Sequence, residues 1–102
     1  MNFLTHNETN VSVNGTCLQG VIGADYSILC ELFGEPTEGD NYKTDAEWLV
    51  EFADGTVATI YNWKNGKNYC GEDGLDVDDI CEWHIGGNSS RAVLLVEQVM
   101  EQ

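Results

Sequence analysis

The sequence predicts an α+β domain in which a mainly antiparallel sheet packs against two amphipathic helices, in the approximate order β-β-α-β-β-β-α. Three observations predict this class. Two β-rich runs flank Asp54-Gly55, apolar residues recur at helical spacing in two other segments, and the 102 residues, 42% of them hydrophobic, suffice for one modest core. We expect a single domain over residues 1–102, with residues 1–10 frayed or forming an edge.

Residues 46–64 are expected to form the central hairpin of the sheet. Trp48, Val50 and Phe52 occupy alternate positions, and the alternation resumes after the Asp54-Gly55 pair. An Asp-Gly pair between two such runs is a strong hairpin signal, because glycine adopts the positive φ that the turn requires. Further apolar residues on the second face indicate a sheet that is covered, at least in part, on both sides.

The chain before this hairpin predicts a shorter hairpin followed by a helix. Residues 11–13 and 16–18 flank Asn14-Gly15, which is a second hairpin signal. A helix is expected over 26–33, because Asp25 can cap it and its apolar residues recur at helical spacing. Gly34 and Pro36 then end the helix, and the polar residues that follow predict an exposed loop over 37–44.

The chain after the central hairpin predicts an acidic surface loop, a strand and a second helix. Residues 69–79 are rich in aspartate and glycine, and residues 80–85 have the composition of a strand. Asn88 or Ser89 can cap a helix that runs to near Met100. Its apolar residues recur at helical spacing and are Ala92, Leu95, Val96 and Val99.

The charge of the chain restricts its partners. Four cationic residues stand against 18 acidic ones, which gives a net charge of -14. Direct binding to DNA, RNA or an anionic membrane requires basic surface and is therefore not expected. The charge has two explanations: a solvated acidic face, or an acidic surface that imitates nucleic acid and blocks a nucleic-acid-binding protein.

Export and metal signals are weak in this sequence. The first six residues lack a basic region and a long apolar run, and no stretch has the length of a transmembrane span. The four cysteines form no C-x-x-C pair, so we expect free, mostly buried thiols in a reducing cytoplasm, with zinc or a disulfide as the alternatives. The aspartates of 69–79 lack the ligand spacing of an EF-hand, so no metal or cofactor is expected.

Residues 86–91, Gly-Gly-Asn-Ser-Ser-Arg, are a candidate anion site. A glycine pair and hydroxyl groups at a helix start present free backbone N–H groups and the positive end of the helix dipole. Arg91 can hold phosphate oxygens, and a bound anion would compensate its unfavourable place in the first helical turn. The alternative is an ordinary helix cap, with Arg91, like Lys64 and Lys67, paired to acids on the surface.

Aromatic side chains gather in the same half of the sequence as these cations. Tyr61, Trp63, Tyr69 and Trp83, with His84, are a supply of rings on which nucleotide bases stack. The alternative is that Trp63 and Trp83 belong to the core, and we expect at least one of them to do so. No nucleophile with a partner base and no distinct carboxylate pair is recognisable, so we expect no enzyme activity.

Two segments, DGTVATIYNWKNGKNY at 54–69 and EWHIGGNSSRAVLLV at 82–96, carry a family resemblance. They resemble a large set of small bacteriophage proteins, with good agreement over 46–99 and weaker agreement over 16–36. This set is similar to the viral anti-CBASS sponge proteins. Those proteins bind cyclic dinucleotides such as cyclic GMP-AMP without cleaving them, and so deprive host defence effectors of their signal.

The resemblance implies a location, an assembly and a site. The location is the host bacterial cytoplasm, and the assembly is a homo-oligomer, a dimer or tetramer, with ligand at subunit boundaries. The implied ligand-binding residues are Thr59, Tyr61, Asn62, Trp63, Lys64, Trp83, His84, Gly86, Gly87, Ser89 and Arg91. The alternative function is an acidic nucleic-acid mimic that inhibits a host defence complex, of the anti-CRISPR or anti-restriction type.

Overall fold

A computed structural model describes residues 2–101 and confirms the α+β class. One five-stranded antiparallel sheet has the strand order β1-β3-β4-β5-β2. The strands are β1 (Phe3–Thr5), β2 (Cys17–Gly23), β3 (Glu47–Phe52), β4 (Val57–Tyr61) and β5 (Glu82–Gly87). The helices are α1 (Tyr26–Phe33), α2 (Lys67–Cys70) and α3 (Arg91–Met100), with 3₁₀ turns at Gly71–Asp73 and Val77–Asp79.

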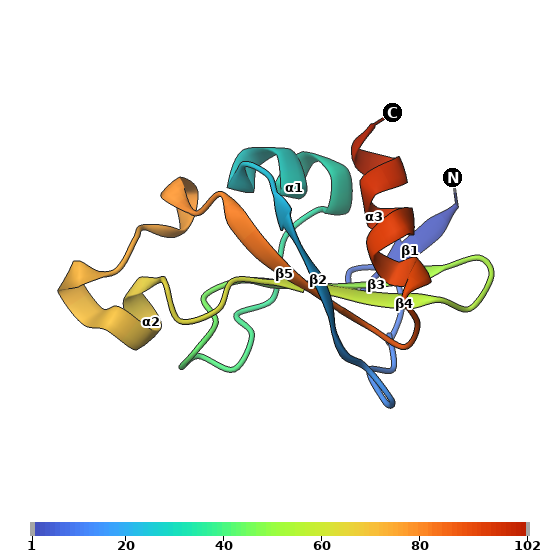
Figure 1. Cartoon of the computed structure of the whole chain (residues 1–102), viewed down its shortest axis with the longest axis horizontal. Helices are drawn as coiled ribbons and strands as arrows, with labels where there is room; N and C mark the ends of the chain where they lie inside the picture. Colours follow the sequence, from blue (N-terminus) through green and yellow to red (C-terminus); the bar gives the residue numbers. More distant parts are fainter. Residues whose placement is uncertain (1, 102) are drawn as a thin grey trace.

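The helices α1 and α3 cover the same face of the sheet (Figure 1). The segment that contains α2 projects from one end of the sheet instead, and the molecule is accordingly elongated, with principal extents of 41 × 28 × 24 Å. None of the helices in the described part of the chain is long and apolar enough to cross a membrane. The opposite face of the sheet carries no helix of the described residues, and the candidate site lies there.

The central hairpin forms as predicted from β3 and β4. Its register places Trp48 opposite Ile60 and Val50 opposite Ala58. Gly55 has a φ of 90°, the positive value that the turn requires. The Asp54 carboxylate accepts a hydrogen bond of 2.9 Å from the backbone N–H of Thr56, which closes the turn.

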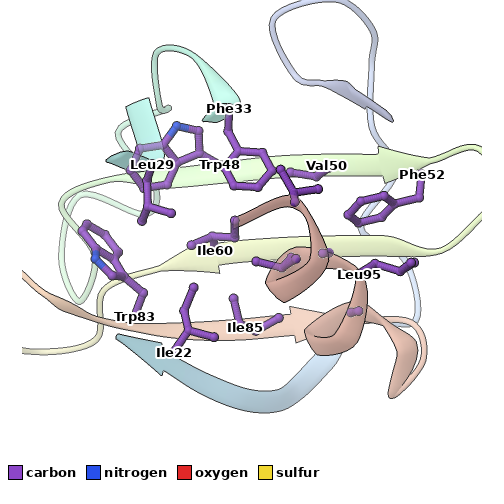
Figure 2. Packing of buried hydrophobic residues seen from close by; sticks show 14 of the residues in the cluster. Ile22, Leu29, Phe33, Trp48, Val50, Phe52, Ile60, Trp83, Ile85 and Leu95 are labelled. Carbon is purple, nitrogen blue, oxygen red and sulfur yellow. The ribbon is translucent and has the colours of Figure 1, made fainter. Parts of the chain in front are cut away.

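The core lies between this sheet and the two long helices (Figure 2). Trp48, Ile60, Trp83 and Ile85 are completely buried on the sheet side. The predicted apolar face of α3 is confirmed, because Ala92, Leu95, Val96 and Val99 are all buried. Burial of each large apolar side chain contributes about 1.5–3 kcal/mol, so this layer is the main stabilising contact of the fold.

Two buried indoles fix α1 at both of its ends. Trp83 Nε1 donates to the carbonyl of Ala24 at 2.9 Å, just before the helix, and Trp48 Nε1 donates to the carbonyl of Gly34 at 2.7 Å, just after it. Asp25 occupies the N-cap position but makes no side-chain capping bond. A helix of eight residues is marginal on its own, so these tertiary contacts hold it in place.

The predicted first hairpin is wrong. Residues 11–13 form no strand, and β2 pairs with β5 rather than with the segment before it. The local turn survives only as a backbone hydrogen bond of 3.2 Å from Thr16 to Val13. Pairing with β5 buries Ile22 against Trp83, and this long-range apolar contact outweighs the local turn signal. The predicted N-terminal edge does form, because β1 pairs with β3.

Three further expectations need correction. Residues 69–79 contain part of α2 and both 3₁₀ turns, because the region folds on itself through local hydrogen bonds such as Cys70 N–H to Gly66 O at 3.0 Å. The strand predicted at 80–85 begins and ends two residues later, so Gly86 and Gly87 are strand residues paired with β4. The cysteines are free, but three of the four are exposed, because they lie at strand and helix margins rather than on core positions.

Candidate functional site

A groove of about 330 Å³ opens on the helix-free face of the sheet. Its floor contains Leu49, Thr59 and Gly86 from the three central strands, and Leu18 of the edge strand β2 borders it. Glu47, Tyr61 and Trp63 line it as well. The volume lies at the lower end of the range for small-molecule sites.

Gly86 packs closely against Thr59 and Tyr61 in the floor of the groove. It pairs with Thr59 across β4 and β5, and a β-carbon built on Gly86 would collide with the Thr59 hydroxyl. The same β-carbon would lie 3.5 Å from the Tyr61 ring. Gly86 is buried, and a side chain here would force Thr59 to move, so glycine allows the close packing of this part of the groove floor.

Three rings form an aromatic cluster at one end of the groove: Tyr61, Trp63 and His84. The Trp63 and His84 rings are stacked, with centroids 6.2 Å apart and an interplanar angle of 23°. Tyr61 meets both edge-on, at 6.1 Å from Trp63 and 5.6 Å from His84. Trp63 is 39% exposed, so the cluster presents a tryptophan to solvent.

Two lysines flank Trp63. Lys43 Nζ lies 5.3 Å and Lys64 Nζ 5.6 Å from its ring centroid. Their loops are joined by a backbone hydrogen bond of 2.8 Å from Lys64 N–H to the Lys43 carbonyl. Exposed cation–π contacts contribute about 0.5–1 kcal/mol each, so the ammonium groups can move onto a bound anion at small cost.

Asn62 holds these two loops together. Its side chain is completely buried. Its Oδ1 accepts hydrogen bonds from the backbone N–H groups of Asp45 (2.7 Å) and Ala46 (3.2 Å). Its Nδ2 donates to the side-chain oxygens of Asp45 (2.9 Å) and Asn65 (3.0 Å). Asn62 therefore positions the neighbouring Trp63 and Lys64 and does not face the groove.

Asp40 orders the loop that carries Lys43. One of its carboxylate oxygens accepts backbone hydrogen bonds from Tyr42 and Lys43 at 2.9 Å and from Thr44 at 3.0 Å. These bonds, that from Tyr42 first, hold the pKa of the Asp40 carboxyl below its ordinary value. The ionised form is thus part of the folded loop.

Glu47 has the opposite electrostatic character. It is half-buried at the start of β3, opposite Tyr61. Burial, and then the charge of Asp40, raise the pKa of the Glu47 carboxyl. Burial also raises the pKa of the Tyr61 hydroxyl, and the Glu47 charge adds to this shift.

The segment 86–91 is used within the fold. Asn88 Oδ1 accepts from the backbone N–H of Val57 at 2.9 Å, and Ser89 Oγ accepts from the backbone N–H of Arg91 at 3.0 Å. Arg91 pairs with Asp54 through Nη2 at 3.1 Å and Nε at 3.2 Å. The anion that the sequence predicts beside Arg91 is thus supplied by the chain's own β3–β4 turn.

The predicted site residues therefore separate into three groups. The groove and its aromatic rim contain Thr59, Tyr61, Trp63, Lys64, His84 and Gly86. Asn62 and Trp83 are completely buried and act as supports. Gly87 faces Ala92 of α3, while Ser89 and Arg91 lie at the Val57 end of β4, away from Tyr61.

Sequence reasoning missed Lys43 and Glu47. Lys43 lies in a loop 20 positions before Trp63, and no local pattern joins the two. The scarcity of cations was the available signal, because Lys43 is one of only four in the chain. Glu47 could not be singled out from the sequence, because acidic residues are abundant around it.

Residues 2–101 bring together no group of three or more His, Cys, Asp or Glu side chains that could hold a metal ion. No protein-family model, no curated protein and no solved structure matches the chain. Function is therefore inferred from the groove and the side chains around it.

Proposed function

We propose that the protein binds a cyclic dinucleotide, such as cyclic GMP-AMP, on the helix-free face of the sheet and sequesters it without cleavage. In this proposal it is a bacteriophage immune-evasion protein that acts in the host bacterial cytoplasm against CBASS signalling. The observation that carries the proposal is the aromatic cluster beside the groove, flanked by two of the chain's four cations.

The aromatic cluster supplies the affinity for a base. Stacking of a nucleobase on an aromatic side chain contributes roughly 1–3 kcal/mol. Trp63 presents an exposed ring at the rim of the groove, backed by His84 and Tyr61. Leu18 and Leu49 add apolar surface against the same base.

Lys43 and Lys64 are the cations available to a phosphate. The other two cations are engaged in ion pairs, Lys67 with Asp76 at 3.1 Å and Arg91 with Asp54 at 3.1 Å. Lys43 and Lys64 instead lie over aromatic rings, which concentrates positive charge at one point of an acidic protein. A charge-assisted hydrogen bond to phosphate is about twice as strong as a neutral one, so this placement favours an anionic ligand here.

A homo-oligomer fits the edge of the sheet next to the groove. The edge strand β2 contains no charged residue and no proline, and its Leu18 and Val21 are 56% and 49% exposed. Natural proteins usually protect a strand edge of this kind with charge or cover, so a second copy along β2 is the proposed partner. Two grooves would then lie near one boundary and hold the two bases of one ligand.

The arrangement of the rings favours binding over catalysis. His84 is stacked over Trp63 and meets Tyr61 edge-on, a position suited to holding a ring. General-base activation of a nucleophile would instead require a directed hydrogen bond from a hydroxyl or thiol to the imidazole. We therefore expect the bound nucleotide to be released unchanged.

Calorimetric titration with a panel of cyclic di- and trinucleotides tests the proposal. The protein in which Lys43 and Lys64 are both replaced by alanine should bind at least about tenfold more weakly, since a hydrogen bond to a charged group contributes about 1.5–3 kcal/mol. Lys67→Ala is the matched control and should bind like the wild type. Tight binding with intact ligand recovered by anion-exchange chromatography supports sequestration, whereas absence of heat across the panel, or recovery of cleaved ligand, contradicts it.

A second candidate is an acidic inhibitor that imitates nucleic acid. The specific observation is the projecting segment around the 3₁₀ turns, where Glu72, Asp73, Asp78 and Asp79 are all exposed. Its test is competition with DNA for a purified CRISPR effector complex or restriction enzyme. Neutralising these four side chains should abolish competition if this candidate is right, and should leave nucleotide binding unchanged if sequestration is right.

A further inference from the structure

We infer that Glu47 makes the groove selective for guanine, with its carboxylate accepting hydrogen bonds from N1–H and the 2-amino group of a base stacked against the aromatic cluster. This inference rests on the proposed nucleotide binding and adds the identity of the base.

The backbone of Glu47 is fixed beside the rings. Glu47 and Thr37 exchange two backbone hydrogen bonds, of 2.7 and 3.0 Å, on one side of β3. On the other side Glu47 pairs with Tyr61 of β4. Glu47, Tyr61 and Trp63 all line the groove. In the proposed complex, the base stacked on Trp63 would therefore turn its edge toward this carboxylate.

The Glu47 carboxylate is free to accept, unlike the other carboxylate that lines the groove. Asp40 Oδ1 already accepts from three backbone N–H groups and from the Thr44 hydroxyl. Within residues 2–101, Glu47 has no side-chain hydrogen bond and no ion pair, although it is half-buried. A partly buried acceptor without a partner gains most from a ligand that brings donors.

Guanine presents the donors that a carboxylate requires. Its N1–H and 2-amino N–H point in the same direction and match the two carboxylate oxygens, as a guanidinium does. Adenine presents the bare N1 lone pair at the same place, which would face a negative oxygen. Sites that hydrogen-bond a substrate group discriminate strongly against the analogue that lacks it, so the ionised carboxylate favours guanine.

Protonation should relax this selectivity. Burial and the charge of Asp40 raise the pKa of the Glu47 carboxyl, so it protonates before ordinary glutamates as the pH falls. The other titratable groups that line the groove are Asp40 from the loop, Tyr61 from β4 and Cys17 from β2. A protonated Glu47 could donate to adenine N1, so acidification should weaken guanine binding and strengthen adenine binding.

The test compares cyclic di-GMP with cyclic di-AMP by calorimetry on three proteins: wild type, Glu47→Gln and Glu51→Gln. Glu51 is the matched control, because it lies four residues further along β3 on the same face but is exposed and does not line the groove. At neutral pH the wild type should bind cyclic di-GMP about tenfold more tightly or better, and Glu47→Gln should lose about that factor for cyclic di-GMP alone. Glu51→Gln should behave as the wild type.

Two results would overturn the inference in distinguishable ways. Equal affinities for the two ligands in the wild type, or unchanged cyclic di-GMP affinity in Glu47→Gln, would refute guanine selection and leave nucleotide binding intact. Failure of both ligands to bind would refute the proposed nucleotide binding and this inference with it. Measurements at several pH values add a separate readout. The preference of the wild type for cyclic di-GMP over cyclic di-AMP should fall on acidification, whereas the preference of Glu47→Gln should stay the same.

Discussion

Replacing Asn62 with alanine should destabilise the fold rather than simply remove a ligand contact. The side chain is completely buried and makes four hydrogen bonds, two of them as acceptor to the backbone N–H groups of Asp45 and Ala46. A buried donor left without its acceptor costs about 1–3 kcal/mol. Because water can reach the half-exposed Asp45 but not the buried Ala46, we expect a loss of about 2–4 kcal/mol in the free energy of unfolding.

The assay is urea unfolding followed by tryptophan fluorescence. The midpoint should fall in Asn62→Ala while the slope stays the same, since the surface exposed on unfolding is unchanged. The exposed Asn10→Ala is the control and should unfold like the wild type. Nucleotide affinity should fall as well, because the loops that carry Lys43 and Trp63 lose their tie. An unchanged unfolding curve with lost nucleotide binding would instead identify Asn62 as a ligand contact.

Three other substitutions separate the roles of the groove, the start of α3 and the loop that carries Lys43. Trp63→Ala should weaken cyclic dinucleotide binding about tenfold, the scale of one lost stacking contact. It should also lower the free energy of unfolding by about 1–3 kcal/mol, because the ring contacts with Tyr61 and His84 are lost. Calorimetry and urea unfolding measure the two effects. Arg91→Ala should leave nucleotide affinity unchanged. It should lower the free energy of unfolding by less than about 1 kcal/mol, because the ion pair of Arg91 with Asp54 is exposed. A large loss of nucleotide affinity would show that the anion binds at the start of α3 instead. Asp40→Asn should make the free energy of unfolding less sensitive to acid. The folded pKa of Asp40 lies below the ordinary 3.8, so its stabilising contribution is present above that value and is lost as the pH falls through the folded pKa. An unchanged fall of stability at acidic pH in the variant would contradict this.

The parts of the fold that sequence predicts well are those encoded by neighbouring residues. The β3–β4 hairpin follows from alternation around Asp54-Gly55, and α1 ends at Gly34, whose φ is 84°, as the glycine and the proline after it indicate. The apolar positions of α3 follow equally from helical spacing. Each of these signals lies within a dozen residues of the structure it specifies.

The parts that sequence does not predict depend on contacts between distant segments. A local turn signal at Asn14-Gly15 suggests a hairpin, but β2 instead pairs with β5, some 65 positions later. This pairing is favoured because it buries Ile22 in the core. The same limit applies to the site. Strand alternation cannot tell that Trp83 is buried while Trp63 is exposed, since that depends on which face α1 and α3 cover.

Arg91 shows how a correct physical expectation can have an unexpected solution. An arginine at the start of a helix is unfavourable next to the positive end of the helix dipole, and a nearby anion offsets this cost. The structure supplies it from the β3–β4 turn as Asp54, a residue 37 positions earlier whose proximity no sequence pattern reveals. Lys43 reaches Trp63 in the same non-local way, so no local pattern in the sequence reveals this contact.

A two-dimensional ¹H–¹⁵N NMR titration with cyclic GMP-AMP would show directly whether the ligand occupies the groove. The three tryptophan indole N–H signals distinguish the groove from the core, because Trp63 is exposed and Trp48 and Trp83 are completely buried. If the ligand binds in the groove, the signals of the Trp63 indole and of the amides of residues 59–64 and 84–86 should shift, while those of α3 should not. Shifts centred on Ser89, Arg91 and Asp54, or no shifts at all, would contradict binding in the groove.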